Sequence, residues 1–272
     1  MKKLQDRVAV VTGAASGIGR ATAIALAKEG CALALADVNE VGLEETAAAV
    51  RALGRKATTH RVDVADKDRM RRFADEVQEA HGAVHVLVNN AGVTVTAPFE
   101  EHSLEDWEWI VGINFWGVVY GCKFFLPYLK QADEAHIVNL SSLFGLIGVP
   151  AQSSYCATKF AVRGLSEALW VELKDLNIGV TAVHPGGVRT NIAKSARTEG
   201  AALKSFGIDL IERFSVSPER CARQIVQAIK TNKMRLLVTR ETHFIDVAKR
   251  FSNVLPQRFL LAGYRRQLQG KP

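Results

Sequence analysis

The sequence predicts one doubly wound α/β domain built on a parallel sheet, and three observations support that prediction. Short β-branched runs alternate with longer amphipathic stretches throughout the first 190 residues. The connections between them are short, which favours right-handed crossovers between parallel strands. No linker, internal repeat or low-complexity block interrupts the alternation. A chain of 272 residues is also long enough to bury one large hydrophobic core.

Each strand is expected where a buried β-branched run occurs, and each helix where apolar residues recur at helical spacing. The predicted strands are 8–12, 32–36, 57–62, 84–89, 136–140, 179–183 and 235–238. The predicted helices are 17–28, 40–53, 66–80, 104–113, 118–129, 155–173 and 218–230. Segment 188–215 is less periodic, and its small and polar residues suit a mobile lid.

The composition is that of an ordinary globular protein, with 48% apolar and 23% charged residues. The formal net charge is +7, but residues 231–272 hold nine basic residues against two acidic ones, so the preceding chain is neutral overall. The basic character therefore belongs to a tail and not to the domain. For this reason the sequence predicts no nucleic-acid partner.

The four cysteines are scattered along the chain, at Cys31, Cys122, Cys156 and Cys221. They show neither CxxC spacing nor a Cys/His cluster, so we expect free thiols in a reducing compartment and no metal site. Charges interrupt the first residues too early for a secretory signal, and no run approaches the ~18 apolar residues of a membrane span. The expected location is the cytoplasm.

A glycine-rich turn follows the first predicted strand. Residues 12–19 read Thr-Gly-Ala-Ala-Ser-Gly-Ile-Gly, and a predicted helix continues from them. Glycines at such a turn let the backbone approach a pyrophosphate, and the helix N-terminus offers unpaired N–H groups and a positive dipole end. The turn therefore predicts a dinucleotide site that includes Gly13, Ser16, Gly17, Ile18 and Gly19.

Small and polar residues end the next three strands. Asp37 ends the second strand, where a carboxylate accepts hydrogen bonds from the adenosine ribose hydroxyls and repels a 2′-phosphate. Neither Val38 nor Ser16 supplies a positive charge, so NAD is favoured over NADP. In the alternative interpretation, Asp37 only caps the loop into the next helix. The other candidates beyond strand ends are Asp63, Val64, Asn90, Ala91 and Gly92.

Ser142, Tyr155 and Lys159 form the candidate catalytic group. Tyr155 and Lys159 are four residues apart, so both project from one face of a helix. An ammonium beside a phenol lowers the phenol pKa from about 10 toward neutrality, which would make Tyr155 a general acid or base. Ser142 ends a strand segment and can hold a substrate oxygen. An isolated Tyr and Lys at this spacing would instead fit a solvated helix face.

Together these residues resemble the short-chain dehydrogenase/reductase family. The matching motifs are Thr12-Gly-x-x-x-Gly-Ile-Gly19, Asn89-Asn-Ala-Gly92, Asn114, Ser142 and Tyr155-x-x-x-Lys159. The loop from His184 to Thr190 is similar to the loop after the sixth strand of that family. The resemblance implies a Rossmann fold and a catalytic domain over residues 1–240, with residues 241–272 as an extension.

The resemblance also implies a role for each motif residue. Tyr155 would exchange a proton with the substrate oxygen, Ser142 would polarise that oxygen, and Lys159 would bind the nicotinamide ribose. Asn114 would hold a water that joins Lys159 to solvent. Pro185, Gly186, Val188 and Thr190 would position the nicotinamide ring. No metal is required, because tyrosine and serine polarise the substrate oxygen.

The expected activity is NAD-dependent interconversion of a secondary alcohol and a ketone. The candidate substrate walls are 93–98, 143–149, Gln152 and 188–215, which are mainly apolar or small and suit a hydrophobic substrate. Trp107, Trp109 and Trp116 are expected to pack in helices or at an interface. Two alternatives stay open: a 3-oxoacyl-thioester reductase and a catalytically idle NAD-sensing scaffold.

The extension and two long helices carry the expectations about partners. Phe244, Val247, Ala248 and Phe251 recur at helical spacing in a basic segment. We expect this apolar face to pack over the cleft or on a neighbouring subunit, with an anionic membrane as the less favoured alternative. Apolar positions along 115–129 and 161–173 favour a homo-oligomer, a dimer or a tetramer.

Overall fold

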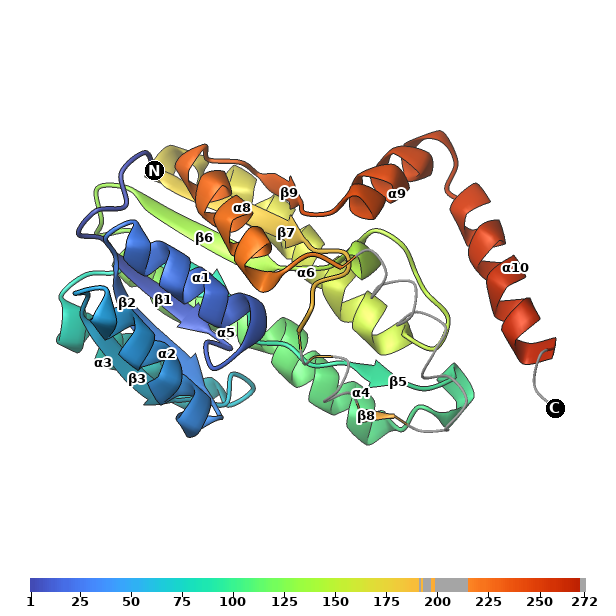
Figure 1. The fold of residues 1–272 in the computed structure, drawn as a ribbon, viewed down its shortest axis with the longest axis horizontal. Helices are drawn as coiled ribbons and strands as arrows, with labels where there is room; N and C mark the ends of the chain where they lie inside the picture. Colours follow the sequence, from blue (N-terminus) through green and yellow to red (C-terminus); the bar gives the residue numbers. More distant parts are fainter. Residues whose placement is uncertain (191, 193–196, 199–214, 270–272) are drawn as a thin grey trace.

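Seven parallel strands form the central sheet of the computed structural model, which describes residues 1–190, 192, 197–198 and 215–269 (Figure 1). The strand order is β3-β2-β1-β4-β6-β7-β9. The strands are β1 (Val8–Thr12), β2 (Ala32–Asp37), β3 (Ala57–Arg61), β4 (Val86–Asn89), β6 (Ala135–Leu140), β7 (Ile178–His184) and β9 (Arg235–Leu237). This order confirms the predicted doubly wound α/β fold in a single domain.

Helices cover both faces of the sheet and enclose two apolar cores (Figure 1). One face packs against α1 (Gly17–Lys28), α2 (Glu40–Ala52) and α8 (Pro218–Lys230). The other face packs against α3 (Lys67–His81), α5 (Gly117–Leu129) and α6 (Ser153–Glu172). Because helices cover both faces, every residue of central strands such as β1 and β6 is buried, and burial does not alternate along them.

The order of the strands reverses beside β1. This strand lies between β2 and β4. From β1 the chain adds β2 and β3 on one side, and then β4, β6, β7 and β9 on the other side. Val11 pairs with Leu35 on one side and with Val88 on the other. In an open parallel sheet, a crevice forms at this point beyond the carboxyl ends of the strands. The fold therefore directs the ends of β1, β2 and β4 to one site.

A continuous helical segment runs from α4 (Leu104–Val111) through the π-helical turn η2 (Gly112–Trp116) into α5. Its 26 residues, Leu104–Leu129, are long and apolar enough to cross a membrane, although the sequence led us to expect no such run. This is weak evidence for a span, because core helices meet the same criterion. Phe125 and Leu129 of this segment are fully buried in the core beneath the sheet.

Several elements were not predicted from the sequence. β5 (Val95–Thr96) pairs in parallel with β8 (Arg197–Thr198) in a second, two-stranded sheet. Short 3-10 turns occur at η1 (Phe99–Glu101), η3 (Leu143–Gly145) and η4 (Lys174–Leu176). The predicted lid over 188–215 lies mostly outside the described residues. Within its described part, Val188 pairs with Val216, so this end of the segment is attached to the domain.

The extension forms two helices, α9 (Arg240–Phe251) and α10 (Leu255–Gln269), which meet at the turn between them and diverge from it (Figure 1). The apolar face that we expected to pack is largely exposed: Phe244 is 72% exposed and Phe251 is 87% exposed. This face does not pack over the cleft of its own protomer. Of the two packing arrangements expected from the sequence, contact with a neighbouring subunit is therefore the one to test.

Candidate active site

A cavity of about 790 Å³ opens beyond the carboxyl ends of the strands, where the strand order reverses. It is lined by nearly all the residues that the sequence suggested for cofactor and substrate. They are Gly13, Ser16, Gly17, Ile18, Asp37, Asp63, Val64, Asn90, Ala91, Gly92, Ser142, Gln152, Tyr155, Lys159, Pro185, Gly186, Val188 and Thr190. Gly19 and Asn114 are not in its lining; they lie behind the wall and support it.

The glycine turn has the shape of a cradle for a phosphate group. Gly13 and Gly17 have φ values of +64° and +53°, a region that side chains rarely adopt. Asn90 Nδ2 donates to the carbonyls of Thr12 and Gly13, at 2.9 and 3.1 Å, and ties the turn to β4. A Cβ on Gly19 would lie 2.0 Å from the Gly13 oxygen. The turn therefore fits a dinucleotide, whose pyrophosphate would face the N-terminus of α1.

Asp37 bonds to two loop backbones and also lines the cavity. Its carboxylate oxygens accept hydrogen bonds from the backbone N–H of Ala15 and of Asn39, each at 3.0 Å. It thus joins the glycine turn to the start of α2 while it also lines the cavity. Arg20, on the nearby α1, donates to the Ala15 carbonyl and to the Glu45 carboxylate. Its charge is therefore already paired with a carboxylate.

Tyr155 and Lys159 project from α6 into the cavity, opposite Ser142 at the start of η3. The Lys159 Nζ lies 5.5 Å from the centre of the Tyr155 ring and donates to the Leu140 carbonyl at 2.9 Å. Burial raises the pKa of Tyr155 to about 12, although the nearby Ser142 side chain acts in the opposite direction. Burial also lowers the pKa of Lys159 to about 8.

These directions differ from the expectation that Lys159 lowers the pKa of the phenol. Desolvation disfavours the charged form of each group, so it raises the phenol pKa and lowers the ammonium pKa. With the protein groups alone, this desolvation dominates over the attraction between phenolate and ammonium. Tyr155 is therefore protonated at neutral pH, in the form that donates a proton to a substrate oxygen.

Asn114 lies in the π-helical turn η2, fully buried behind the cavity wall. Its Oδ1 accepts from the Val93 N–H at 2.8 Å, and its Nδ2 donates to the Val93 carbonyl at 2.9 Å. A Cβ on Gly92 would lie 3.3 Å from this Oδ1 and 3.4 Å from the Lys159 Nζ. Asn114 therefore fixes the loop after β4 beside Lys159. The sequence did not suggest that Asn114 would bond to the backbone of Val93.

Gln152 lines the cavity, but its amide already has partners. The Thr94 hydroxyl donates to Gln152 Oε1 at 3.0 Å, and Gln152 Nε2 donates to the Thr96 hydroxyl at 2.7 Å. The side chain therefore connects the start of α6 to β5, which is part of the same cavity wall. In this arrangement its direct effect is to position Thr94 and Thr96.

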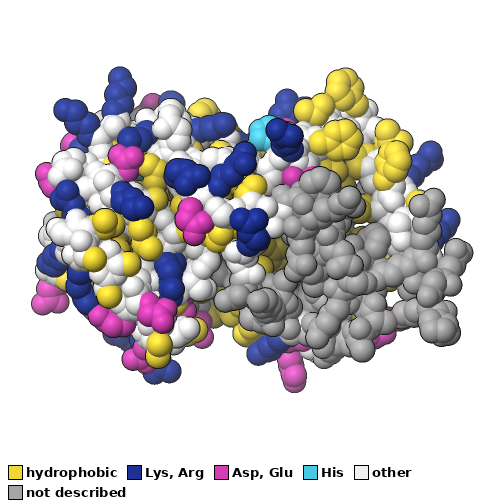
Figure 2. Space-filling view, in the orientation of Figure 1, with side chains coloured by type: hydrophobic (Ala, Val, Ile, Leu, Met, Phe, Trp, Pro, Cys, Tyr) yellow, Lys and Arg dark blue, Asp and Glu magenta, His cyan; other side chains and the backbone are white. Residues whose placement is uncertain are grey.

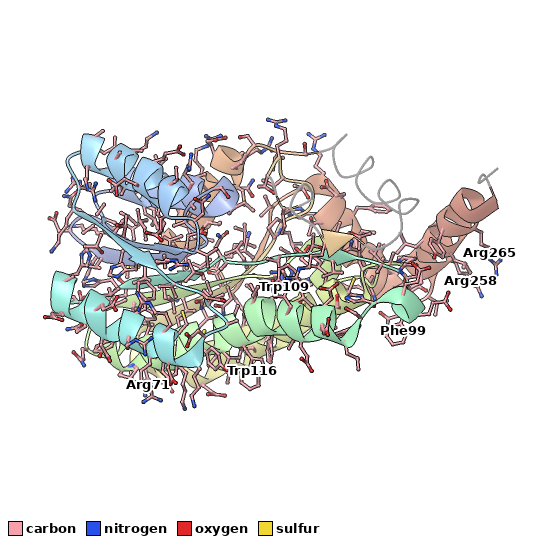
Figure 3. All side chains as sticks on the ribbon, turned by 90° about the horizontal axis from the view of Figure 1, so that it is seen from below. Arg71, Phe99, Trp109, Trp116, Arg258 and Arg265 are labelled. Atoms are coloured by element: carbon pink, nitrogen blue, oxygen red, sulfur yellow. The ribbon has the colours of Figure 1, made fainter. Side chains whose placement is uncertain are left out.

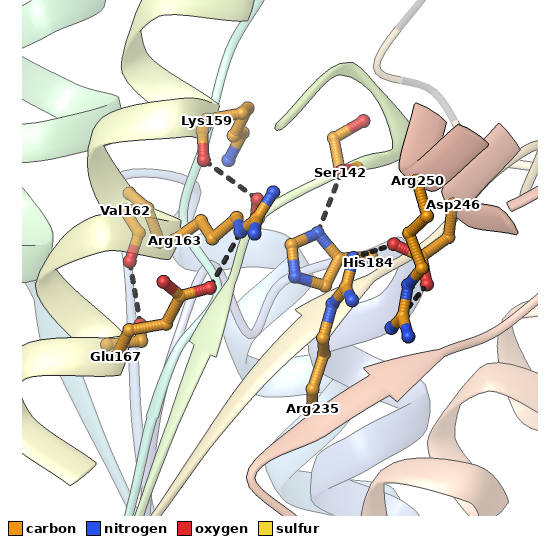
Figure 4. Close-up of polar contacts among 11 residues, drawn as sticks. Ser142, Lys159, Val162, Arg163, Glu167, His184, Arg235, Asp246 and Arg250 are labelled. Carbon is orange, nitrogen blue, oxygen red and sulfur yellow. Dashed lines mark hydrogen bonds and ion pairs between the residues drawn. The ribbon is translucent and has the colours of Figure 1, made fainter. Parts of the chain in front are cut away.

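Contacts from distant segments support Ser142 and the loop beside it, and the sequence did not indicate them. His184 Nδ1 lies 3.0 Å from the Ser142 carbonyl (Figure 4). Leu143 N–H donates to the Pro185 carbonyl at 2.7 Å. Glu241, in the first turn of α9, accepts from the Gly187 N–H at 3.1 Å. These contacts connect three segments that are far apart in the chain, so no local sequence pattern could have indicated them.

The aromatic residues are divided between the protein surface and the cavity. None of Trp107, Trp109 and Trp116 lines the cavity. Trp109 lies under the guanidinium of Arg197, 3.8 Å from the ring centre, and Trp116 is exposed on the segment that leads into α5 (Figure 3). Tyr264 of α10 does line the cavity and was not predicted.

The predicted state of the cysteines is confirmed, since all four are free and buried. Burial raises the pKa of the Cys156 thiol, near the cavity, to about 11. A thiol with such a pKa is protonated and a poor nucleophile. Within the described part of the chain, no group of three or more His, Cys, Asp or Glu side chains is arranged to hold a metal ion.

We expect protonation of His184 to make the fold less stable in acid. Burial lowers its pKa to about 4, and the positive charges of Arg235 and Arg163 act in the same direction (Figure 4). The unfolded chain takes up this proton near pH 6.5. Above pH 6.5 His184 is neutral in both states and costs no stability. As the pH falls from 6.5 toward 4, the free energy of unfolding decreases by about 1.4 kcal/mol per pH unit.

The measurement is urea unfolding between pH 7.5 and 4.5 of the wild type and of His184→Asn. An Asn amide can still donate to the Ser142 carbonyl but takes up no proton, so the pH dependence should become weaker by up to one proton. His243→Gln, at an exposed histidine of α9, is the matched control for removal of an imidazole. An unchanged slope in His184→Asn would contradict this assignment.

Comparison with known proteins agrees with the geometry of the fold and the site. A family model described as short chain dehydrogenase matches residues 7–201. Over 267 residues the chain is 41% identical to a Mycobacterium tuberculosis protein named oxidoreductase SadH, covering 97% of both chains. It is 35% identical over 188 residues to the 3-oxoacyl-[acyl-carrier-protein] reductase FabG of Thermotoga maritima, covering 69% of this chain and 76% of FabG.

A solved structure shares the whole architecture. It is a short-chain dehydrogenase/reductase from Burkholderia phymatum in complex with NAD, with a TM-score of 0.83 and 33% identity. The match covers 92% of this chain and 93% of the other. The sheet order, the glycine turn and the Tyr–Lys pair at one edge define an oxidoreductase of the nucleotide-binding α/β class. The chain belongs to the short-chain dehydrogenase/reductase family.

Proposed function

We propose that this protein is an NAD-dependent oxidoreductase that interconverts a secondary alcohol and a ketone on a hydrophobic substrate. The observation that carries the proposal is the position of the Tyr155 phenol. It lines the same cavity as the glycine turn and Ser142, with Lys159 on the next turn of the same helix. A proton donor and a dinucleotide cradle on one cavity are what this reaction requires.

Each catalytic residue has a distinct proposed task. Tyr155 gives its proton to the substrate oxygen during reduction and takes it back during oxidation. Ser142 donates a hydrogen bond to the same oxygen, so charge that develops there is stabilised. Lys159 places a positive charge beside both the phenol and the ribose site. NAD, when bound, supplies the acceptor or donor of the hydride.

Residues around the cradle would hold the dinucleotide in register with Tyr155. The N–H groups of Ser16, Gly17 and Ile18 would face the pyrophosphate, since the first turn of α1 contains no acidic side chain that would repel it. The nicotinamide would be bordered by Pro185, Gly186, Val188 and Thr190. The adenosine and its ribose would be bordered by Asp63, Val64, Asn90, Ala91 and Gly92. Asn114 would support Lys159, directly or through a water.

Asp37 supports NAD in preference to NADP. Its carboxylate lines the cavity at the end of β2, where it would accept hydrogen bonds from ribose hydroxyls and would repel a 2′-phosphate. The adjacent Val38 carries no charge and is 61% exposed. Arg20, the cation on the neighbouring helix, is already bonded to Glu45. A hydrogen bond to a charged group contributes about 1.5–3 kcal/mol, or roughly a tenfold to hundredfold preference.

The remaining cavity wall supports an apolar substrate. Val93, Leu143, Phe144, Val149 and Pro150 line the side that faces Tyr155. The Phe144 ring meets the Tyr155 ring edge to face, with centroids 6.0 Å apart. A pocket with an apolar wall and only a few polar groups takes a ligand that is largely apolar around one reacting oxygen.

A 3-oxoacyl-thioester reductase is the second candidate function. The similarity to the Thermotoga maritima FabG favours it, because the same apolar wall would accept an acyl chain. Reduction of a 3-oxo group would use Tyr155 and Ser142 in the same way. A thioester reductase that required a coenzyme with a 2′-phosphate would not fit this cavity, because the Asp37 carboxylate would repel that phosphate.

The experiment is a screen of secondary alcohols, ketones and a 3-oxoacyl thioester with NAD(H) and with NADP(H). Turnover is read from the absorbance of the reduced nicotinamide. We expect activity with an apolar alcohol or ketone and a tenfold or larger preference for NAD(H), set by Asp37. Turnover of the thioester alone would favour the second candidate. Tight NAD binding without any turnover would point to a scaffold or sensor.

A further inference from the structure

The two C-terminal helices present an outer surface of exposed apolar side chains. We define the C-terminal arm as residues 240–265, which comprise α9 and the described side chains of α10. Its exposed apolar side chains are Phe244, Val247, Phe251, Val254, Leu255, Phe259 and Leu261. Figure 2 shows apolar side chains gathered over α9 and α10, with basic side chains at their edge. Seven exposed apolar side chains on two adjacent helices and the turn between them indicate a binding surface.

The arm is also basic on its outer side. Arg240, Arg250, Arg258 and Arg265 are exposed among the apolar side chains. The arm has only two acidic residues, and both face inward: Glu241 accepts from the Gly187 N–H, and Asp246 pairs with Arg235 and Arg250. The outer surface is therefore composed of apolar and positively charged groups, so its partner must be apolar and negatively charged.

This chain carries such a surface itself. We define the acidic surface as residues 99–108, which include η1 and most of α4. Phe99 and Leu104 are 73% and 79% exposed, and the carboxylates of Glu100, Glu101, Glu105 and Glu108 are exposed around them. No Lys or Arg occurs between residues 98 and 111. The acidic surface thus complements the arm in both charge and apolar character.

The two surfaces do not cover each other within one protomer, since both are exposed in it. Figure 3 shows Phe99 at the same end of the molecule as Arg258 and Arg265. We propose that the C-terminal arm docks on the acidic surface of a second copy of this chain. Because both surfaces lie at one end, a two-fold axis lets each arm reach the acidic surface of the other copy.

An anionic lipid surface would also attract the arm, but the position of the acidic surface disfavours it. An arm that lay on anionic lipid would bring the exposed carboxylates at the same end of the molecule toward like charge. In a pair of chains, by contrast, those carboxylates meet arginines, and Phe99 and Leu104 meet apolar side chains. Association of two chains would bury both the C-terminal arm and the acidic surface, whereas an anionic lipid would bind the arm and repel the acidic surface.

The test is a charge exchange, measured by sedimentation velocity at micromolar concentration. The arm variant is Arg258→Glu with Arg265→Glu. The surface variant is Glu101→Lys with Glu108→Lys, which leaves Glu105 in the first turn of α4. We expect wild-type chains to associate and each variant to associate about tenfold more weakly or worse, because like charges now face each other. An equimolar mixture of the two variants should associate as the wild type does.

Recovery in the mixture is informative because misfolding of either variant would prevent it. The matched control is Lys2→Glu with Lys3→Glu, at exposed lysines of the N-terminus, which should sediment as the wild type. Wild-type sedimentation of both variants, or a mixture that fails to recover, would overturn the proposal. Binding of wild-type chain to phosphatidylglycerol vesicles that only the arm variant loses, without a change in self-association, would overturn it in favour of lipid.

Discussion

Replacing Tyr155 with Phe should reduce kcat by about 10²- to 10⁴-fold, because the variant has no proton to exchange with the substrate oxygen. The affinity for NAD should stay largely unchanged, since the glycine turn and Asp37 are on other elements. The fold should tolerate the change, because the ring keeps its edge-to-face contact with Phe144. The measurements are steady-state kinetics on the best substrate of the screen and quenching of protein fluorescence by NADH.

Tyr128→Phe is the matched control for this prediction. Tyr128 lies on α5, where its hydroxyl donates to the Asp75 carboxylate at 2.6 Å, and it is not in the cavity lining. The control variant should keep the wild-type kcat. If Tyr155→Phe retained full activity while Tyr128→Phe did so as well, another group would have to supply the proton and the proposed function would lose its central residue.

Replacing Gly19 with Ala should abolish tight binding of the dinucleotide. The new Cβ would lie 2.0 Å from the Gly13 carbonyl oxygen and 2.5 Å from Asn90 Nδ2, both of which must move. Those two groups hold the turn against β4, so the cradle itself is displaced. Overpacking of this kind also lowers the free energy of unfolding by about 1–3 kcal/mol. Titration with NADH and urea unfolding measure the two effects.

Gly164→Ala is the matched control, because Gly164 is also a helical glycine and a Cβ there meets nothing within 4 Å. This variant should bind NADH as the wild type does. It should also be more stable by about 0.5–1 kcal/mol, since alanine favours the helix. NADH binding by Gly19→Ala with wild-type affinity would show that the turn does not hold the dinucleotide.

The predicted elements of the central domain all occur in the structure because each is defined by a local pattern. Strands such as β1 and β7 are buried on both faces, and helices such as α3 begin at a capping residue, here Asp66, whose side chain accepts from the N–H groups of Asp68 and Arg69. These signals lie within a few residues of one another. Elements without such a signal, including the two-residue strands β5 and β8, were missed.

The candidate site shows the same division. Gly13, Asp37, Tyr155 and Lys159 were identified because each stands at a recognisable place relative to a strand end or along a helix. The partners of these residues were not identified, such as the two threonines that bond the amide of Gln152. The direction of the Tyr155 pKa was also misjudged, because burial cannot be read from the spacing of two residues.

Short-range patterns encode the succession of strands and helices along the chain, the glycine turn and the residue types that carry the chemistry. Tertiary packing sets how far the phenol and the ammonium are desolvated, which segments support Ser142, and where the C-terminal arm points. Those properties depend on groups more than forty residues apart, such as Ser142 and His184, or Gly187 and Glu241. Packing brings them together, and no local pattern records that contact.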